Sequence, residues 1–123
     1  MQQHKIAALL QIEYLAGRTR TLRIADSEDL AGFVGEFAEC HENALRWTSA
    51  NRGSRVVEGW VATNEWLFEK HSVVTTRNGD LLCITPKHES AFVGPFIEYQ
   101  DIWDEAAFSE LPPQVMVPMV VPL

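Results

Sequence analysis

The 123-residue chain has few of the features that mark well-known protein classes. It has only two cysteines, Cys40 and Cys83, which excludes a fold held by several disulfides and favours free thiols in a reducing cytoplasm. No apolar run approaches the roughly 20 residues of a membrane span, and the first apolar stretch is too short for a signal peptide. Glycine-rich phosphate loops and dinucleotide fingerprints are also absent, so no cofactor is expected.

Positive charge is scarce as well. Ten Lys and Arg residues stand against 17 Asp and Glu, which makes the formal net charge −7. Phosphate backbones and anionic lipids repel such a chain, so neither a nucleic acid nor a membrane is an expected partner. Basic residues do gather locally, and we interpret them as solvated surface. These are Arg18, Arg20, Arg23, Arg46, Arg52 and Arg55.

Apolar residues, in contrast, are plentiful. Hydrophobic residues make up 46% of the chain, with four Trp and six Phe, which is enough for one core without a metal or disulfide. The length fits a single domain, residues 1–123. The apolar, proline-rich tail at 111–123 is expected to be extended and to lie against this domain or another copy of the chain. A homo-oligomer formed through the tail is therefore one expectation.

The apolar pattern predicts helices first and strands afterwards. Residues 5–16 fit a short helix or an apolar strand, residues 19–25 alternate like a strand, and residues 28–39 have helical spacing after the candidate N-caps Asp26 and Ser27. Further strands are predicted at 55–63, 66–77, 80–86 and within 91–99, and a short helix at 101–111. This order is typical of an α+β fold in which N-terminal helices pack on an antiparallel sheet.

The Asn-Gly pair at residues 78–79 predicts a hairpin, because both residues tolerate positive φ. A two-residue loop there places His71 and Cys83 on opposite faces of the sheet. A three-residue loop, residues 78–80, places His71 on the same face as Cys83 and Thr85. The sequence is compatible with both registers.

Cys40 is the candidate nucleophile. It lies in the run ECHENALRW, residues 39–47, just ahead of an apolar-periodic stretch. A cysteine attacks as the thiolate, and its pKa falls beside a helix N-terminus or a histidine cation. No Pro or Gly between residues 36 and 52 decides whether a helix begins at Cys40 or continues through it. In the second case Cys40 is a small core residue.

His71 is the candidate base, because it begins a strand after a polar stretch. Its second ring nitrogen needs an orienting partner on the next strand, and Asp80, Cys83 and Thr85 are the candidates. Asn43, three residues after Cys40, is a candidate for positioning a carbonyl substrate.

Two further features flank these candidates. Trp60 belongs to a Gly-Trp pair that indicates close packing beside a large ring, in the core or at a cleft wall. His41 and Glu42 occupy other helix faces than Cys40, so we interpret both as solvated.

Several short motifs follow one another in a recognisable order: CHEN at 40–43, GW at 59–60, HSVV at 71–74 and NGDLLCITP at 78–86. This order resembles a family of small, mostly uncharacterised bacterial and phage proteins. More remotely, a helix-borne Cys followed by a strand-borne His is similar to papain-like cysteine hydrolases of the transglutaminase and NlpC type. The resemblance implies a papain-like core, with Cys40 as nucleophile and His71 as general base. It also implies a third triad member near position 83, where this chain has a cysteine instead of Asp, Asn or His.

The leading hypothesis is a thiol-dependent hydrolase or acyltransferase that acts on an amide or ester of a small molecule or peptide. The alternative is a non-enzymatic module, such as a phage or plasmid accessory protein, that binds a protein partner through its acidic surface and apolar tail. A metal-binding domain is the third option, although the candidate ligands lack the short spacings typical of zinc sites. Those ligands are Cys40, His41, His71, Cys83 and His88.

Overall fold

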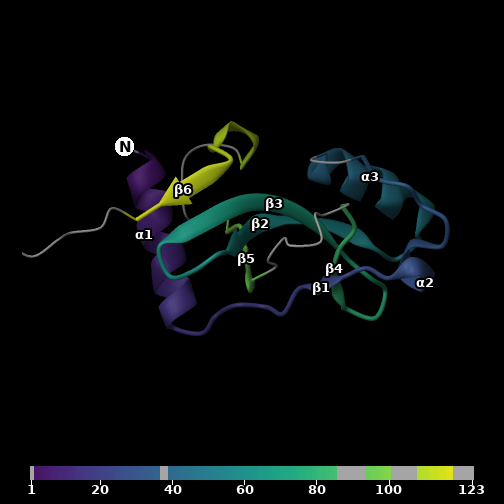
Figure 1. Cartoon of the computed structure of the whole chain (residues 1–123), viewed down its shortest axis with the longest axis horizontal. Coiled ribbons are helices and arrows are strands. Elements are labelled where there is room, and N and C mark those ends of the chain that lie inside the picture. Colours follow the sequence, from purple (N-terminus) through teal and green to yellow (C-terminus); the bar gives the residue numbers. More distant parts are fainter. Residues whose placement is uncertain (1, 37–38, 86–93, 101–107, 118–123) are drawn as a thin grey trace, which may run out of the picture.

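A computed structural model of the chain describes residues 2–36, 39–85, 94–100 and 108–117. Its elements are α1 (Gln2–Leu15), β1 (Arg23–Ile24), α2 (Ser27–Leu30), α3 (Cys40–Ala50), β2 (Arg55–Ala62), β3 (Leu67–Thr75), β4 (Leu81–Cys83), β5 (Phe96–Glu98), the 3-10 helix η2 (Phe108–Glu110) and β6 (Gln114–Met116). Figure 1 shows α1 and β6 near one end of a sheet and α3 near the other. The predicted α+β class is confirmed, while the papain-like core stays a prediction. Among the described helices, none is long and apolar enough to cross a membrane.

The six strands form one sheet in the order β1-β4-β3-β2-β5, and β6 pairs with β3. The hairpin predicted at the Asn-Gly pair is confirmed, since β3 and β4 pair antiparallel, and β2 and β3 pair antiparallel along their whole length, from Arg55 opposite Thr75 to Ala62 opposite Phe68. The prediction of a purely antiparallel sheet is wrong, because β1 runs parallel to β4. The long connection through α3 and the β2–β3 hairpin makes this parallel pairing possible.

One edge of β3 is shared by two short strands. The start of β3 pairs with β6, and its end, at Val74 and Thr75, pairs with β4. Residues 70–73 lie between these two partners, opposite β2. This stretch contains Lys70, His71 and Ser72, so the gap between the short strands coincides with the polar part of β3.

Both long helices pack on the same face of the sheet. Trp60 and Phe68 share a core cluster with residues of α1, whereas Val74 shares one with Trp47 of α3. Side chains separated by an even number of positions project from the same side of a strand, and the β2–β3 register aligns these positions. The two helices therefore cover opposite ends of one face (Figure 1). A third cluster covers the other face: Leu22, Val57, Val61, Val73, Leu81, Cys83 and Phe96.

The predicted helix over 28–39 is wrong in length, because α2 ends at Leu30. Ala31 and Gly32 follow with φ of 47° and 87°, in the left-handed region that stops a helix. The Ala31 N–H still donates to the Ser27 carbonyl, which closes the last turn. A separate helix, α3, then begins at Cys40, so two helices replace the single continuous one.

The remaining elements follow the predictions in outline. Residues 5–15 belong to the helix α1, the 19–25 strand shrinks to the two residues of β1, and the described part of 91–99 contains β5. Residues 108–111 of the predicted 101–111 helix are described, and 108–110 form η2. In the tail, Val115 is fully buried and β6 pairs with β3 of the same chain, while residues 118–123 lie outside the described part.

Close packing at the Gly-Trp pair is confirmed, with a different ring from the one expected. A Cβ at Gly59 would collide with the Ile97 carbonyl and the Phe96 ring. The large ring that requires glycine here is therefore that of Phe96 on β5, whereas Trp60 packs on the other face of the sheet.

Candidate functional site

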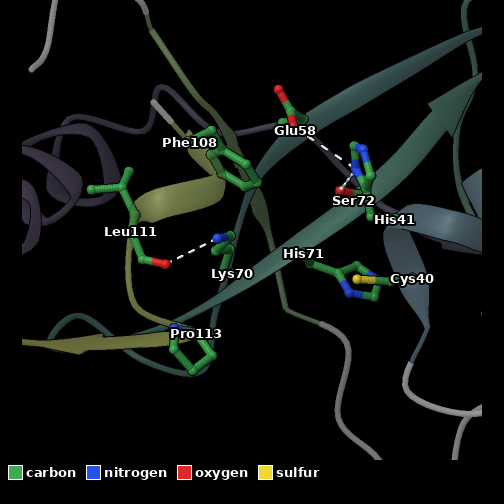
Figure 2. A pocket seen from close by; sticks show the side chains of 9 residues that line it. All are labelled: Cys40, His41, Glu58, Lys70, His71, Ser72, Phe108, Leu111 and Pro113. Atoms are coloured by element: carbon green, nitrogen blue, oxygen red, sulfur yellow. Dashed lines mark hydrogen bonds and ion pairs between the residues drawn. The ribbon is translucent and has the colours of Figure 1, made fainter. Parts of the chain in front are cut away.

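A pocket of about 550 Å³ lies between the start of α3 and the segment that leads into β6. We call it the central pocket. Nine residues line it, as Figure 2 shows: Cys40, His41, Glu58, Lys70, His71, Ser72, Phe108, Leu111 and Pro113. Its volume is in the range typical of small-ligand sites. Both predicted catalytic residues, Cys40 and His71, therefore border one hollow, although α3 packs on one face of the sheet and the His71 side chain lies on the other face with Cys83.

Cys40 is the first residue of α3, so of the two alternatives that the sequence left open, the helix that begins at Cys40 is the one observed. The N–H of Asn43 is the first that bonds back along the helix, to the Glu39 carbonyl at 2.8 Å. The three preceding N–H groups have no acceptor within the helix. Glu39, the N-cap residue, makes no side-chain hydrogen bond to this described turn. The thiol thus sits beside backbone donors that a side chain does not cap.

His71 and Cys83 share a face of the sheet, as the longer hairpin loop predicted. Thr75 pairs with Leu81, and the Thr76 N–H donates to the Asp80 carbonyl at 2.9 Å. The loop therefore has three residues, although it occupies 77–79 instead of 78–80. In this register the Nε2 atom of His71 lies 3.2 Å from the Cys83 sulfur, and both side chains are buried.

Cys83 also contacts the chain beyond β4. Its thiol donates to the Thr85 carbonyl at a sulfur–oxygen distance of 3.9 Å. Cys83 therefore links the His71 ring to the segment that follows β4.

Asn43 was a candidate for positioning a substrate, but its described hydrogen bonds are all made within the protein. It is fully buried, its Nδ2 donates to the Glu36 carbonyl at 2.8 Å and to the Thr85 hydroxyl at 3.1 Å, and its Oδ1 accepts from the Glu36 N–H at 2.8 Å. Gly35 lets the loop approach, since a Cβ there would lie 3.1 Å from the Asn43 amide. Asn43 and Thr85 therefore fasten the start of α3 to the end of β4, behind Cys83.

Trp60 supports the pocket from the core. It is fully buried in the cluster under α1, and its ring packs edge-on against Phe108 with 5.2 Å between centroids. Phe108 in turn lines the pocket. Of the two alternatives for Trp60, the described structure places it in the core, one layer behind the wall.

His41 is exposed, as expected, but it also contacts the sheet. Its Nδ1 lies 2.9 Å from the Ser72 hydroxyl and 3.8 Å from the Glu58 carboxylate. Glu58 and Ser72 are direct partners across β2 and β3, on the face that α3 covers. The alternation of the strands gave a signal that these two residues share a face, but nothing local placed His41 above them.

Lys70 also lines the pocket, although the sequence did not mark it as a candidate. Its Nζ donates to the Leu111 carbonyl at 2.9 Å and lies 4.7 Å from the centre of the Phe108 ring, and its N–H donates to the Pro113 carbonyl at 2.8 Å. Burial lowers the pKa of Lys70, whereas the negative charges of Glu58 and Cys40 act in the opposite direction. Lys70 thus brings an ammonium group into the pocket and fixes one of its walls.

The described residues give little support to a metal site or to a basic binding surface. No group of three or more His, Cys, Asp or Glu side chains within the described ranges is arranged to hold a metal ion, and His88 lies outside those ranges. The basic residues of the first strand region are paired with acids: Arg18 with Glu13 at 2.7 Å and Arg23 with Asp29 at 2.6 Å. This agrees with their interpretation as surface residues.

The chain matches no known protein family, and comparisons with curated proteins and with solved structures find no significant match. Its function therefore has to be inferred from the geometry of the pocket.

Proposed function

We propose that the protein is a thiol-dependent hydrolase or acyltransferase that acts on an amide or ester in the central pocket. The observation that carries the proposal is the placement of His71, which lines the same pocket as Cys40 while its Nε2 is held by the buried thiol of Cys83. A general base requires a ring that is held in place by a partner. The position of Cys40 at the start of α3 adds backbone donors beside the sulfur.

In the proposed reaction, His71 accepts the proton of the Cys40 thiol as the sulfur attacks the substrate carbonyl. A sulfur–carbon bond forms, and the oxyanion is stabilised by N–H groups of the first turn of α3. The tetrahedral intermediate collapses with cleavage of the carbon–nitrogen or carbon–oxygen bond, and His71 returns the proton to the leaving group. Water or another acceptor then takes the acyl group from Cys40 and regenerates the thiol.

Cys83 takes the place of the third triad member in this proposal. A histidine base needs its partner chiefly to keep the ring in the right tautomer and orientation. The contact between Cys83 and His71 supports that role without a negative charge, and Thr85 holds the Cys83 thiol hydrogen.

Acylation by p-nitrophenyl acetate tests the proposal. We expect a burst of one nitrophenolate per chain, faster than with free cysteine at the same pH, and an acetyl group on Cys40 in the mass spectrum. Cys40→Ser should abolish the burst, and His71→Gln should slow it by about 10²–10⁴-fold. Cys83→Ser is the matched thiol control: it should keep the burst, at a reduced rate.

Two results would overturn the enzymatic proposal. One is a burst of equal size in the folded Cys40→Ser variant, and the other is an unchanged acylation rate in His71→Gln. Either outcome leaves the alternative of a non-enzymatic module that binds a protein partner. Circular dichroism of each variant separates loss of chemistry from loss of fold.

A further inference from the structure

The central pocket has two chemically different ends, which Figure 2 shows apart from each other. At one end lie the groups proposed for the chemistry, Cys40 and His71, together with the His41–Ser72 pair. At the other end, the Lys70 ammonium lies against the Phe108 ring and bonds to the Leu111 carbonyl, and Leu111 and Pro113 also line this end. A ligand that fills both ends has an apolar part next to a group that an ammonium recognises.

The Lys70 ammonium has donors to offer such a ligand. Its described contacts use one of its three N–H donors, on the Leu111 carbonyl, and place the Phe108 ring beside it. Within the described part of the chain, Lys70 forms no ion pair with a carboxylate. A partly desolvated ammonium gains more from an anion than one at the open surface does, because the local dielectric constant is lower.

We propose that the central pocket binds an apolar carboxylate: a ligand in which a carboxylate on Lys70 is joined by a short chain to an aromatic or branched aliphatic group that packs against Phe108, Leu111 and Pro113. As a statement about substrate, this rests on the proposed function. The substrate is then an N-acyl amino acid or the C-terminal residue of a peptide. Attack by Cys40 cleaves its amide bond, the acyl part stays on sulfur, and the amino acid leaves as the amine with the proton from His71.

The other charged groups around the pocket are compatible with this ligand. Glu58 directs its carboxylate to His41, 3.8 Å away, and its negative charge opposes a bound anion. We therefore expect Glu58→Gln to tighten the binding of an apolar carboxylate a few-fold. His41 is half exposed, and its protonation would offset the Glu58 charge.

Binding to the Cys40→Ala protein tests the proposal without any turnover. The probes are 3-phenylpropionate and its neutral isostere 3-phenylpropanamide, compared by calorimetry. We expect the carboxylate to bind at least 10-fold more tightly than the amide. Lys70→Met keeps the apolar stem of the side chain and should remove this preference. Lys5→Met, at an exposed position of α1, is the matched control and should leave it unchanged.

The amide probe also reports whether the pocket survives the substitution, because Lys70 fixes one wall. If Lys70→Met no longer folds, Lys70→Gln, which keeps a donor for the Leu111 carbonyl, should show the same loss of preference. Equal affinity for the two probes, no binding of either, or a preference that persists in a folded Lys70 variant would each overturn the proposal. None of these outcomes involves the thiol, so they are distinguishable from failure of the Cys40 acylation test.

Two sources share this ligand chemistry, a free N-acyl amino acid and a peptide C-terminus. N-acetylphenylalanine and a short peptide ending in Phe separate them, with the corresponding C-terminal amides as neutral controls. Tighter binding of either acid than of its amide supports the carboxylate subsite, and the tighter of the two acids identifies the source.

Discussion

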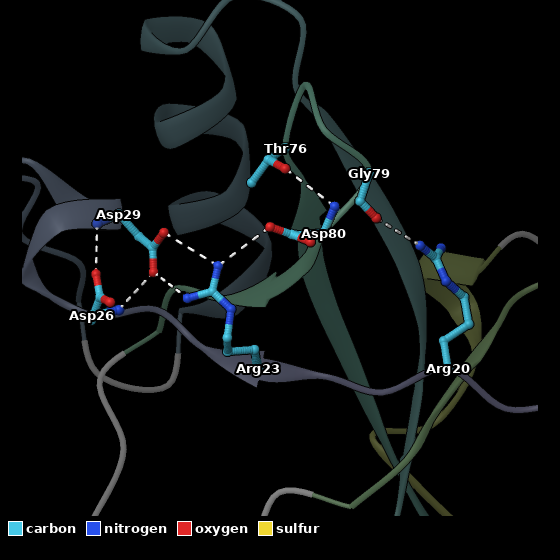
Figure 3. A network of polar contacts seen from close by, with 7 residues as sticks. All are labelled: Arg20, Arg23, Asp26, Asp29, Thr76, Gly79 and Asp80. Atoms are coloured by element: carbon cyan, nitrogen blue, oxygen red, sulfur yellow. Dashed lines mark hydrogen bonds and ion pairs between the residues drawn. The ribbon is translucent and has the colours of Figure 1, made fainter.

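The central pocket and the surface around the β3–β4 hairpin both gather polar side chains from distant parts of the chain, but they use them differently. We call the second group, drawn in Figure 3, the hairpin cluster: Arg20, Arg23, Asp26, Asp29, Thr76, Gly79 and Asp80. There Arg23 pairs with Asp29 at 2.6 Å and with Asp80 at 3.6 Å. In the pocket, the Lys70 ammonium bonds to a carbonyl, and His71 bonds to a thiol.

The difference teaches how to separate structural from functional polar groups. In the hairpin cluster, opposite charges neutralise each other and cap α2, since Asp26 accepts from the Asp29 N–H and Asp29 accepts from the Asp26 N–H. Such groups stabilise local structure. In the central pocket, the described bonds of Lys70 and His71 go to neutral groups, and our proposals assign these two side chains to ligand binding and to chemistry.

Asn43→Ala should have the largest effect on stability, because this residue supports the pocket from the core. It removes three hydrogen bonds of a fully buried amide, two of them to the backbone of Glu36. We expect the free energy of unfolding, measured in urea, to fall by about 3 kcal/mol.

Asn51→Ala provides the comparison on the same helix. Its amide makes a single described bond, to the Trp47 carbonyl at 2.8 Å at the end of α3. A loss of about 1 kcal/mol is expected there. Equal losses in the two variants would contradict the structural role given to Asn43.

Asp29→Asn should have an intermediate effect, and one that depends on pH. The hydrogen bond from Arg23, followed by that from the Asp26 backbone, lowers the pKa of Asp29. A lowered folded-state pKa means that the carboxylate stabilises the fold above its ordinary pKa of about 3.9 and loses this contribution as the pH falls through the folded value. At pH 7 we expect Asp29→Asn to cost about 0.5–1 kcal/mol, given that Arg23 is partly exposed.

Urea unfolding of wild type and Asp29→Asn at several pH values measures this dependence. The difference between the two proteins should stay constant near neutrality and shrink below about pH 4. A difference that grows on acidification would show that the ion pair does not stabilise the folded state. Glu28, which also lies in the first turn of α2 and has an exposed side chain, is the control position, as Glu28→Gln.

Arg20→Met should have the smallest effect. Its guanidinium lies 3.5 Å from the Glu98 carboxylate, and both side chains are more than a third exposed. Water and salt weaken such a pair, so the free energy of unfolding should change by no more than about 0.5 kcal/mol. The backbone bonds between Arg20 and Phe96 remain in the variant. A fall in the free energy of unfolding of more than about 1 kcal/mol, measured by thermal or urea unfolding, would contradict the interpretation of this ion pair as a weak surface contact.

The amount that could be predicted differs from element to element, for physical reasons. The strands β2 and β3 follow from their β-branched residues, and the hairpin that joins β3 to β4 follows from an Asn-Gly pair. Both signals act over short distances along the chain. The end of α2 depended on Ala31, which has no intrinsic preference for the left-handed conformation that it adopts. The hairpin register depended on a loop that begins one residue earlier than the Asn-Gly pair suggested.

The sequence by itself determined the α+β class and the central strands, because each follows from neighbours a few positions apart, and it left open whether a helix begins at Cys40. Only the tertiary structure decided which reactive groups meet. His41 reaches Ser72 across 31 positions, and Lys70 reaches the Leu111 carbonyl across 41. Such contacts arise when two layers pack on one sheet, and the spacing of residues along a chain does not encode the distance between layers.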